Sequence, residues 1–229
     1  MTKSIFEEGY VFLVNKPLEW TSFDVVKKMR SALKIKKIGH AGTLDPLATG
    51  LLIICAGKFT KRINEFMAQK KEYTGIFTLG AVTPTYDLES RPENFKSYDH
   101  ITKENLIEAA QKLTGEISQI PPMHSAIKHE GKRVYELARK GIEVELKPRI
   151  VTIYNFEITK TELPEVHFKI ECSTGTYIRS MANDFGKLLG CGAYLSKLTR
   201  TKIGEYHVDE SRSIEETIDF IKQSLNQNG

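Results

Sequence analysis

The sequence predicts an α+β fold, and two observations support this class. Strand-like segments with alternating apolar residues and helix-like segments with apolar residues at positions i, i+3 and i+4 follow one another along the 229 residues. They do so without the regular strand–helix–strand period of a parallel α/β protein, and without an internal repeat. We therefore expect strands and helices that share one mixed architecture.

Each element follows from its own pattern. Helical spacing of apolar residues defines the helices, and strict alternation defines the two strands between 150 and 172. Gly115 and Gly190 are predicted to end two helices, and Ser213 with Glu216 forms a capping box that begins the last one. The predicted elements are a strand over 10–15, a helix over 22–33, a loop over 39–50, a strand over 51–56, a short helix around 59–67, a strand from Tyr73, a helix over 102–114, strands over 150–158 and 166–172, and helices over 178–189 and 213–225.

The composition, 40% hydrophobic, is that of a folded protein. The N-terminus has no signal-peptide pattern, and no apolar run approaches the ~18 residues that cross a bilayer, so we expect a cytoplasmic protein with no membrane association. Cys55, Cys172 and Cys191 form no Cys-x-x-Cys pair, and the six histidines have no ligand spacing. We expect reduced thiols and no metal.

The formal net charge of +4 is unevenly distributed. Residues 27–37 carry six basic residues and no acid, whereas residues 205–229 carry six acids and two basic residues. A polyanion such as RNA would be attracted to the basic part, although a run of lysines can equally be a solvated face. Residues 121–149 are also basic and begin with two prolines; they are either a surface loop or an arm that grips phosphates.

The loop over 39–50, Gly-His-Ala-Gly-Thr-Leu-Asp-Pro-Leu-Ala-Thr-Gly, is the strongest candidate for an active site. Its glycines permit backbone angles that other residues avoid, and Pro46 biases Asp45 away from helical angles. The apolar run over 51–56 would anchor the loop in the core. Taken alone, an Asp-Pro among glycines is more often a simple turn.

Several ordered blocks extend this motif and together resemble the TruB family of tRNA pseudouridine-55 synthases. The blocks are Asn15-Lys16-Pro17 with Thr21-Ser22, the loop over 39–50, Lys71-Glu72-Tyr73, Thr83-Pro84-Thr85-Tyr86-Asp87, and the segments 121–128, 135–141 and 172–180. The resemblance implies the catalytic fold of that family: a single domain over 1–229 with a mixed, mainly antiparallel central sheet flanked by helices and an RNA-gripping basic insert at 121–149. It also implies a cofactor-free enzyme, expected to be a monomer without an obligatory protein partner, that isomerises uridine-55 in the T stem-loop of tRNA.

The resemblance also assigns roles to individual residues. Asp45 would be the catalytic carboxylate, Tyr73 would stack on the flipped-out base, and Arg179 would hold Asp45 ionised. Tyr73 alone would more often be a core residue, and Arg179 alone a surface arginine. The substrate-binding set is His40, Tyr73, Tyr177, Arg179 and Leu198, and the supporting residues are Lys16 and Asp87. His40 could bond to an RNA phosphate or support the loop, and Asp87 could join the arginine in a polar network or cap a turn.

The chemistry of pseudouridine formation fits a single carboxylate. The glycosidic bond must break and the base must rejoin through C5, which one carboxylate can assist as nucleophile at C1′ or as base at C2′. The sequence does not choose between these routes. A glycoside hydrolase usually uses two carboxylates, so a nucleoside-cleaving hydrolase is disfavoured, and a non-catalytic tRNA binder or folding helper would not need Asp45, Tyr73 and Arg179 together.

Some positions depart from the family pattern. Glu19 and Ser90 stand where glycine is usual, and His124 stands where Tyr or Phe is usual. None of them removes catalytic chemistry. The chain also ends after the predicted helix over 213–225, so we expect a short form without the C-terminal RNA-binding domain that many relatives carry.

Overall fold

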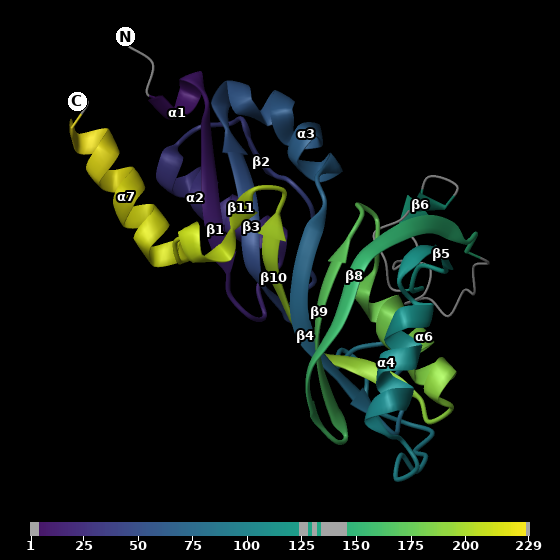
Figure 1. Cartoon of the computed structure of the whole chain (residues 1–229). Helices are drawn as coiled ribbons and strands as arrows, with labels where there is room; N and C mark the ends of the chain where they lie inside the picture. The colour runs from purple at the N-terminus through teal and green to yellow at the C-terminus, as the bar shows by residue number, and fades with distance from the viewer. Residues whose placement is uncertain (1–4, 124–127, 130–131, 134–145, 228–229) are drawn as a thin grey trace. The chain divides into compact units, whose positions relative to one another are not determined.

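The computed structural model describes residues 5–123, 128–129, 132–133 and 146–227 (Figure 1). The chain divides into two compact units. The first unit comprises Met1–Tyr73 and Leu198–Gly229, and the second comprises Thr74–Lys197. Two strands, β4 (Lys71–Leu79) and β10 (Ala193–Ile203), contribute residues to both units.

The first unit contains strands and helices from both ends of the sequence. Its elements are α1 (Ile5–Glu8), β1 (Tyr10–Lys16), α2 (Ser22–Leu33), β2 (Ile38–His40), β3 (Ala48–Ala56), a 3-10 helix over Gly57–Arg62, α3 (Ile63–Ala68), β11 (Tyr206–His207), a 3-10 helix over Val208–Glu210 and α7 (Ile214–Gln227). β1, β2 and β3 pair antiparallel, and β10 runs parallel to β3 with Leu198, Thr199 and Arg200 opposite Ala48, Thr49 and Gly50.

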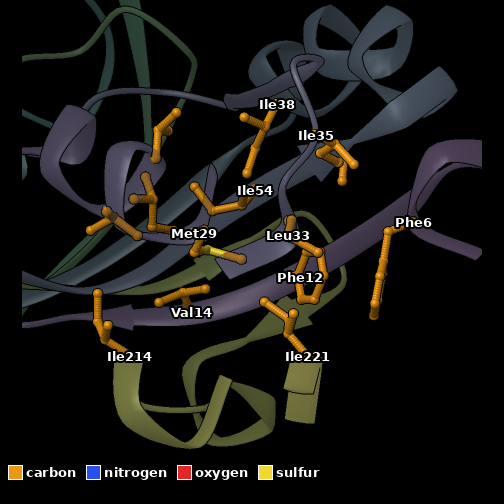
Figure 2. Packing of buried hydrophobic residues seen from close by; sticks show 14 residues of the cluster. Phe6, Phe12, Val14, Met29, Leu33, Ile35, Ile38, Ile54, Ile214 and Ile221 are labelled. Carbon is orange, nitrogen blue, oxygen red and sulfur yellow. The ribbon is translucent and has the colours of Figure 1, made fainter. Parts of the chain in front are cut away.

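Strand β3 is buried on both faces, which explains its continuous apolar sequence. Leu52 and Ile54 face a cluster made with α2, β1 and α7, in which Met29, Val14 and Ile221 meet (Figure 2). Leu51, Ile53 and Cys55, on the opposite face, pack with Phe66 of α3 and Ile203 of β10. A strand fixed on both sides provides a rigid base for the loop that precedes it.

The second unit has an antiparallel sheet in the order β9–β8–β5. Four phenylalanines from β4, β8, β9 and α6 form its aromatic core, and the ring centroids of Phe77 and Phe168 are 4.2 Å apart. The other elements of the second unit are α4 (Lys103–Lys112), β5 (Gly115–Gln119), β6 (Lys128–His129), β7 (Lys132–Arg133), β8 (Arg149–Glu162), β9 (Glu165–Cys172) and α6 (Ile178–Leu189).

The α+β class and the mainly antiparallel sheet are confirmed. The helix over 22–33 and the capping box of Ser213 and Glu216 are also confirmed. The predicted loop over 39–50 was too long, because β2 extends to His40 and β3 begins at Ala48. Only residues 41–47 between these strands are irregular. Strand β10 was not predicted.

Most of the basic segment 121–149, including His124, lies outside the described residues, so its RNA-gripping role stays a prediction. Within the described ranges, no helix is long and apolar enough to cross a membrane. Nor do those residues contain a cluster of three or more His, Cys, Asp or Glu side chains that could hold a metal. The three cysteines are buried, and none of them is in a disulfide.

Candidate active site

The loop that carries Asp45 is tied to the first unit on both sides of the carboxylate. Before Asp45 in the sequence, the Ser22 hydroxyl accepts a hydrogen bond from the Leu44 amide at 2.9 Å and donates one to the Leu44 carbonyl at 3.2 Å. After Asp45, the Ala48 amide donates to the Asp45 carbonyl at 3.0 Å and so closes a turn. The Ala41 amide bonds to the Ile53 carbonyl of β3 at 2.9 Å. These bonds hold the backbone of Asp45 in one conformation.

Lys16, at the end of β1, is a second anchor for the loop. Its side chain is fully buried, and its ammonium donates to the carbonyls of Pro17 at 2.9 Å, Trp20 at 2.6 Å and Pro46 at 3.3 Å. Burial lowers the pKa of the ammonium from 10.5 to about 8, and the Asp45 carboxylate limits that fall. Because the ammonium is close enough to act on Asp45, its charge favours the ionised carboxylate.

We expect the stability of the protein to depend on pH through Lys16. Between pH 8 and 10.5 the unfolded chain keeps the Lys16 proton that the folded chain loses. The free energy of unfolding should therefore rise with pH over this window, by about 3 kcal/mol at its upper end, relative to a Lys16→Met variant. Urea unfolding of both proteins from pH 7 to 10.5 measures the difference. A difference that stays constant with pH would contradict the assignment.

Arg200 of β10 is a third anchor, and sequence reasoning missed it. Its guanidinium is 1% exposed and donates to backbone carbonyls of Leu51 at 2.8 Å and Gly42 at 3.1 Å. It therefore meets the chain both before and after Asp45. A buried positive charge interrupts the alternation of apolar residues along β10, so periodicity gave no sign of the strand.

His40 lies at the end of β2, directly before the loop. Burial, and then the charge of Arg200, lower the pKa of its imidazole. The ring is therefore neutral near pH 7. It can donate and accept hydrogen bonds, but it has no positive charge to attract a phosphate. This favours the loop-supporting role of His40 over a salt-dependent phosphate contact.

Tyr73 and Leu198, the predicted substrate contacts of the first unit, lie on adjoining segments of β4 and β10. The Lys71 ammonium binds the carbonyls of Met67 and Gln69 at the end of α3. The Glu72 carboxylate accepts from the Thr201 hydroxyl at 2.8 Å. The motif Lys71-Glu72-Tyr73 thus fixes the start of β4.

The side chains of Tyr73 and Leu198 are nearly closed to solvent. Tyr73 is 9% exposed and Leu198 is 8% exposed. Leu198 lies opposite Ala48, where β3 leaves the Asp45 loop, and its carbonyl accepts from the Thr49 hydroxyl at 3.4 Å. The structure therefore places Leu198 beside the loop, as its predicted role requires.

In the second unit, Arg179 and Asp87 form a buried ion pair. The Arg179 Nε and Asp87 Oδ2 atoms are 3.6 Å apart, and both side chains are 5% exposed. Arg179 Nη1 also donates to the Thr85 carbonyl at 3.4 Å, and the Glu89 amide donates to Asp87 at 3.0 Å. Asp87 is therefore a partner of the arginine rather than a simple turn cap, and the predicted link of Arg179 with Asp45 stays a prediction.

Tyr177, which precedes α6, is held by a second residue that sequence reasoning missed. The Gln119 side chain is 1% exposed. It accepts from the Tyr177 amide at 2.8 Å and donates to the Tyr177 carbonyl at 3.2 Å. Both Arg200 and Gln119 act on backbone atoms distant in sequence, and such contacts have no local sequence signature.

The unusual residues Glu19 and Ser90 have structural explanations. Glu19 has φ 65, in the left-handed region where glycine is favoured, and its amide donates to the Pro46 carbonyl at 2.8 Å. The turn after β1 thus supports the Asp45 loop at some cost in backbone strain. The Ser90 hydroxyl accepts from the Thr85 amide at 3.0 Å, which stabilises the segment that carries Asp87.

Comparison with known proteins identifies the family. The family model described as "TruB family pseudouridylate synthase (N terminal domain)" matches residues 30–178. The protein named tRNA pseudouridine synthase B of Flavobacterium johnsoniae is 51% identical over 93% of this chain and 96% of its own length. The protein of the same name from Parabacteroides distasonis is 50% identical over 96% of both chains. The chain belongs to the TruB family.

Solved structures share the fold of this chain. A chain in the crystal structure of a Cbf5-Nop10-Gar1 complex superposes with a TM-score of 0.75 at 26% identity, over 98% of this chain and 57% of that chain. A chain in the structure of an H/ACA RNP bound to a substrate RNA containing 2′-deoxyuridine has a TM-score of 0.72 at 24% identity, with 98% and 56% covered. The second likeness concerns the fold alone.

The predicted site residues of the TruB-family chain therefore fall into two groups. Lys16, His40, Asp45, Tyr73 and Leu198 lie in the first unit; Asp87, Tyr177 and Arg179 lie in the second. In the first group, the anchors described above connect Lys16 and Leu198 to the Asp45 loop. In the second group, Arg179 pairs with Asp87, and Tyr177 precedes the helix that carries Arg179.

Proposed function

We propose that this chain converts uridine to pseudouridine in tRNA, at position 55 of the T loop, with Asp45 as its catalytic carboxylate. The observation that carries the proposal is the setting of Asp45. The loop around this carboxylate is fixed by hydrogen bonds at Leu44, Pro46 and Gly42. Two of these bonds come from buried cations, Lys16 and Arg200. A tRNA binder has no need of a carboxylate whose loop is held by two buried cations, one of which, Lys16, also acts on the carboxylate itself, so this setting favours the enzyme.

The reaction balances without a cofactor. The C1′–N1 bond of uridine breaks, the uracil turns, and a C1′–C5 bond forms while C5 loses a proton and N1 gains one. No atom is added and no electron is transferred. An ionised carboxylate can bond to C1′ or remove a proton from C2′, and both routes need the uridine flipped out of its loop.

The remaining site residues have roles in this proposal. Tyr73 would stack on the flipped uracil, with Leu198 and Tyr177 completing the apolar contact. Arg179, already held by Asp87, would hold the Asp45 carboxylate ionised. His40 would support the loop as a neutral ring.

A tRNA transcript and a T stem-loop hairpin test the proposal, each made with uridine or cytidine at position 55. We expect pseudouridine, detected by mass spectrometry of nucleosides and by reverse transcription after carbodiimide treatment, only where uridine is present. Affinity should fall steeply as salt rises, because phosphate contacts dominate. Binding of both RNAs without any pseudouridine would instead support the non-catalytic tRNA binder.

We further propose that the protein acts in the cytoplasm as a monomer of one catalytic domain, without an obligatory protein partner or cofactor. Activity of the purified chain alone, together with its mass by light scattering, tests these points. An inactive purified chain that gains activity from a cell extract would indicate a missing partner.

A further inference from the structure

Arg200 holds the catalytic loop in a way that goes beyond a simple core contact. Strands β3 and β10 approach closely at Gly50, where a Cβ atom would lie 2.3 Å from the Arg200 carbonyl oxygen. Gly50 also has φ 103, so only glycine fits this position. This close approach brings the Arg200 side chain under the loop.

Among the described residues, every hydrogen bond that the Arg200 side chain donates goes to a backbone carbonyl. Nε donates to Leu51 at 2.8 Å, Nη2 to Gly42 at 3.1 Å and Nη1 to Thr43 at 3.4 Å. Two of these carbonyls precede Asp45 and one follows it. The guanidinium thus bridges the two ends of the loop.

Arginine suits this place better than lysine. Its planar group carries five N–H donors in fixed directions, which can reach three separate carbonyls, whereas a lysine ammonium is a single point with three donors. Because carbonyls are neutral, these partners do not cancel the positive charge. That charge acts on neighbouring groups: it helps to lower the pKa of both Lys16 and His40.

We propose that Arg200 is a positioning residue for the reaction, because its guanidinium fixes the conformation of the loop on both sides of Asp45. The inference rests on the proposed function, in which Asp45 is the reacting carboxylate. At 1% exposure, Arg200 has no surface from which to contact RNA. Its effect must therefore appear in the rate of the chemical step and not in RNA affinity.

Two variants test this inference. Arg200→Lys keeps the positive charge but loses the planar set of N–H donors, and Arg200→Gln keeps two N–H donors but loses the charge. We expect kcat to fall about 100-fold in Arg200→Lys and further in Arg200→Gln, while KM and the Kd for tRNA stay within about threefold. Arg212→Lys is the matched control, because Arg212 lies over the Phe220 ring of the same unit and should keep full activity.

Several outcomes would overturn the inference. A rise in KM with unchanged kcat would make Arg200 a binding residue. A loss of activity that follows only the folded fraction, measured by circular dichroism, would make it a core residue, and so would the failure of both variants to fold.

A second measurement is independent of catalysis. Amide hydrogen exchange over residues 41–47 should be at least about tenfold faster in Arg200→Lys than in wild type, with no change in Arg212→Lys. If the wild-type chain makes no pseudouridine, the proposed function fails, yet the exchange data still test the loop contact. Unchanged exchange would refute the role of Arg200.

Discussion

An Asp45→Asn variant should form no detectable pseudouridine and should still fold and bind tRNA. Asparagine keeps the size of aspartate and its hydrogen-bonding oxygen, so the contacts of the loop backbone with Ser22, Lys16 and Arg200 should survive. The amide has no negative charge with which to bond to C1′ or to remove a proton from C2′. The affinity for tRNA should stay within about tenfold, about 1.4 kcal/mol, because phosphate contacts elsewhere carry binding.

Asp219→Asn is the matched control for this experiment. Asp219 lies on α7 of the same unit, and its side chain is 68% exposed. The control should keep full activity, because it removes the same charge from an exposed side chain on a helix. Pseudouridine formation and filter binding are measured side by side on both variants. An active Asp45→Asn protein would falsify the mechanism, because asparagine serves a simple turn nearly as well as aspartate.

The sequence predicted best what depends on nearby residues. The helix over 22–33 was predicted with its correct ends, because its apolar residues keep helical spacing. The structure adds a capping box of Thr21 and Asp24 at its start. The strand at 166–172 was found within one residue because its apolar residues alternate. These patterns are complete within one segment, so no tertiary contact is needed to recognise them.

The errors concern contacts between distant segments. Gly50 was assigned to the loop, but it belongs to β3. Its φ of 103 agrees with the predicted need for glycine, and the Arg200 backbone that lies against it is a second reason that the sequence did not show. Strand β10 was missed because Lys197 and Arg200 interrupt its apolar alternation. Arg200 is buried only because the loop supplies carbonyls to it, and that reason is invisible within β10 itself.

The candidate site shows the same division. Asp45, Tyr73 and Arg179 were predicted through motifs that resemble one family. Gln119 and Arg200 act on backbone atoms far along the chain, and any residue type can provide such atoms. Anchors of this kind are recognised from the folded structure.

The buried pair of Arg179 and Asp87 should contribute more to the free energy of unfolding than a surface ion pair with the same separation of atoms. Asp87→Asn leaves the Arg179 charge in a site that is 5% exposed and removes its carboxylate partner. We expect a loss of about 3 kcal/mol in the free energy of unfolding, measured by urea, and a fall in activity. The double variant Asp87→Asn/Arg179→Gln should lose at least about 1 kcal/mol less than the sum of the two single losses.

The pair of Asp219 and Lys222 is the control for the buried pair. Its atoms are also 3.6 Å apart, but its side chains are 68% and 66% exposed. Because water screens this pair, Asp219→Asn should change the free energy of unfolding by no more than about 0.5 kcal/mol, with no coupling to Lys222→Gln. Equal losses for the two pairs would show that burial does not strengthen the Arg179–Asp87 interaction. Asp87, itself fixed by the Glu89 amide, would then orient the arginine without adding to the stability of the fold.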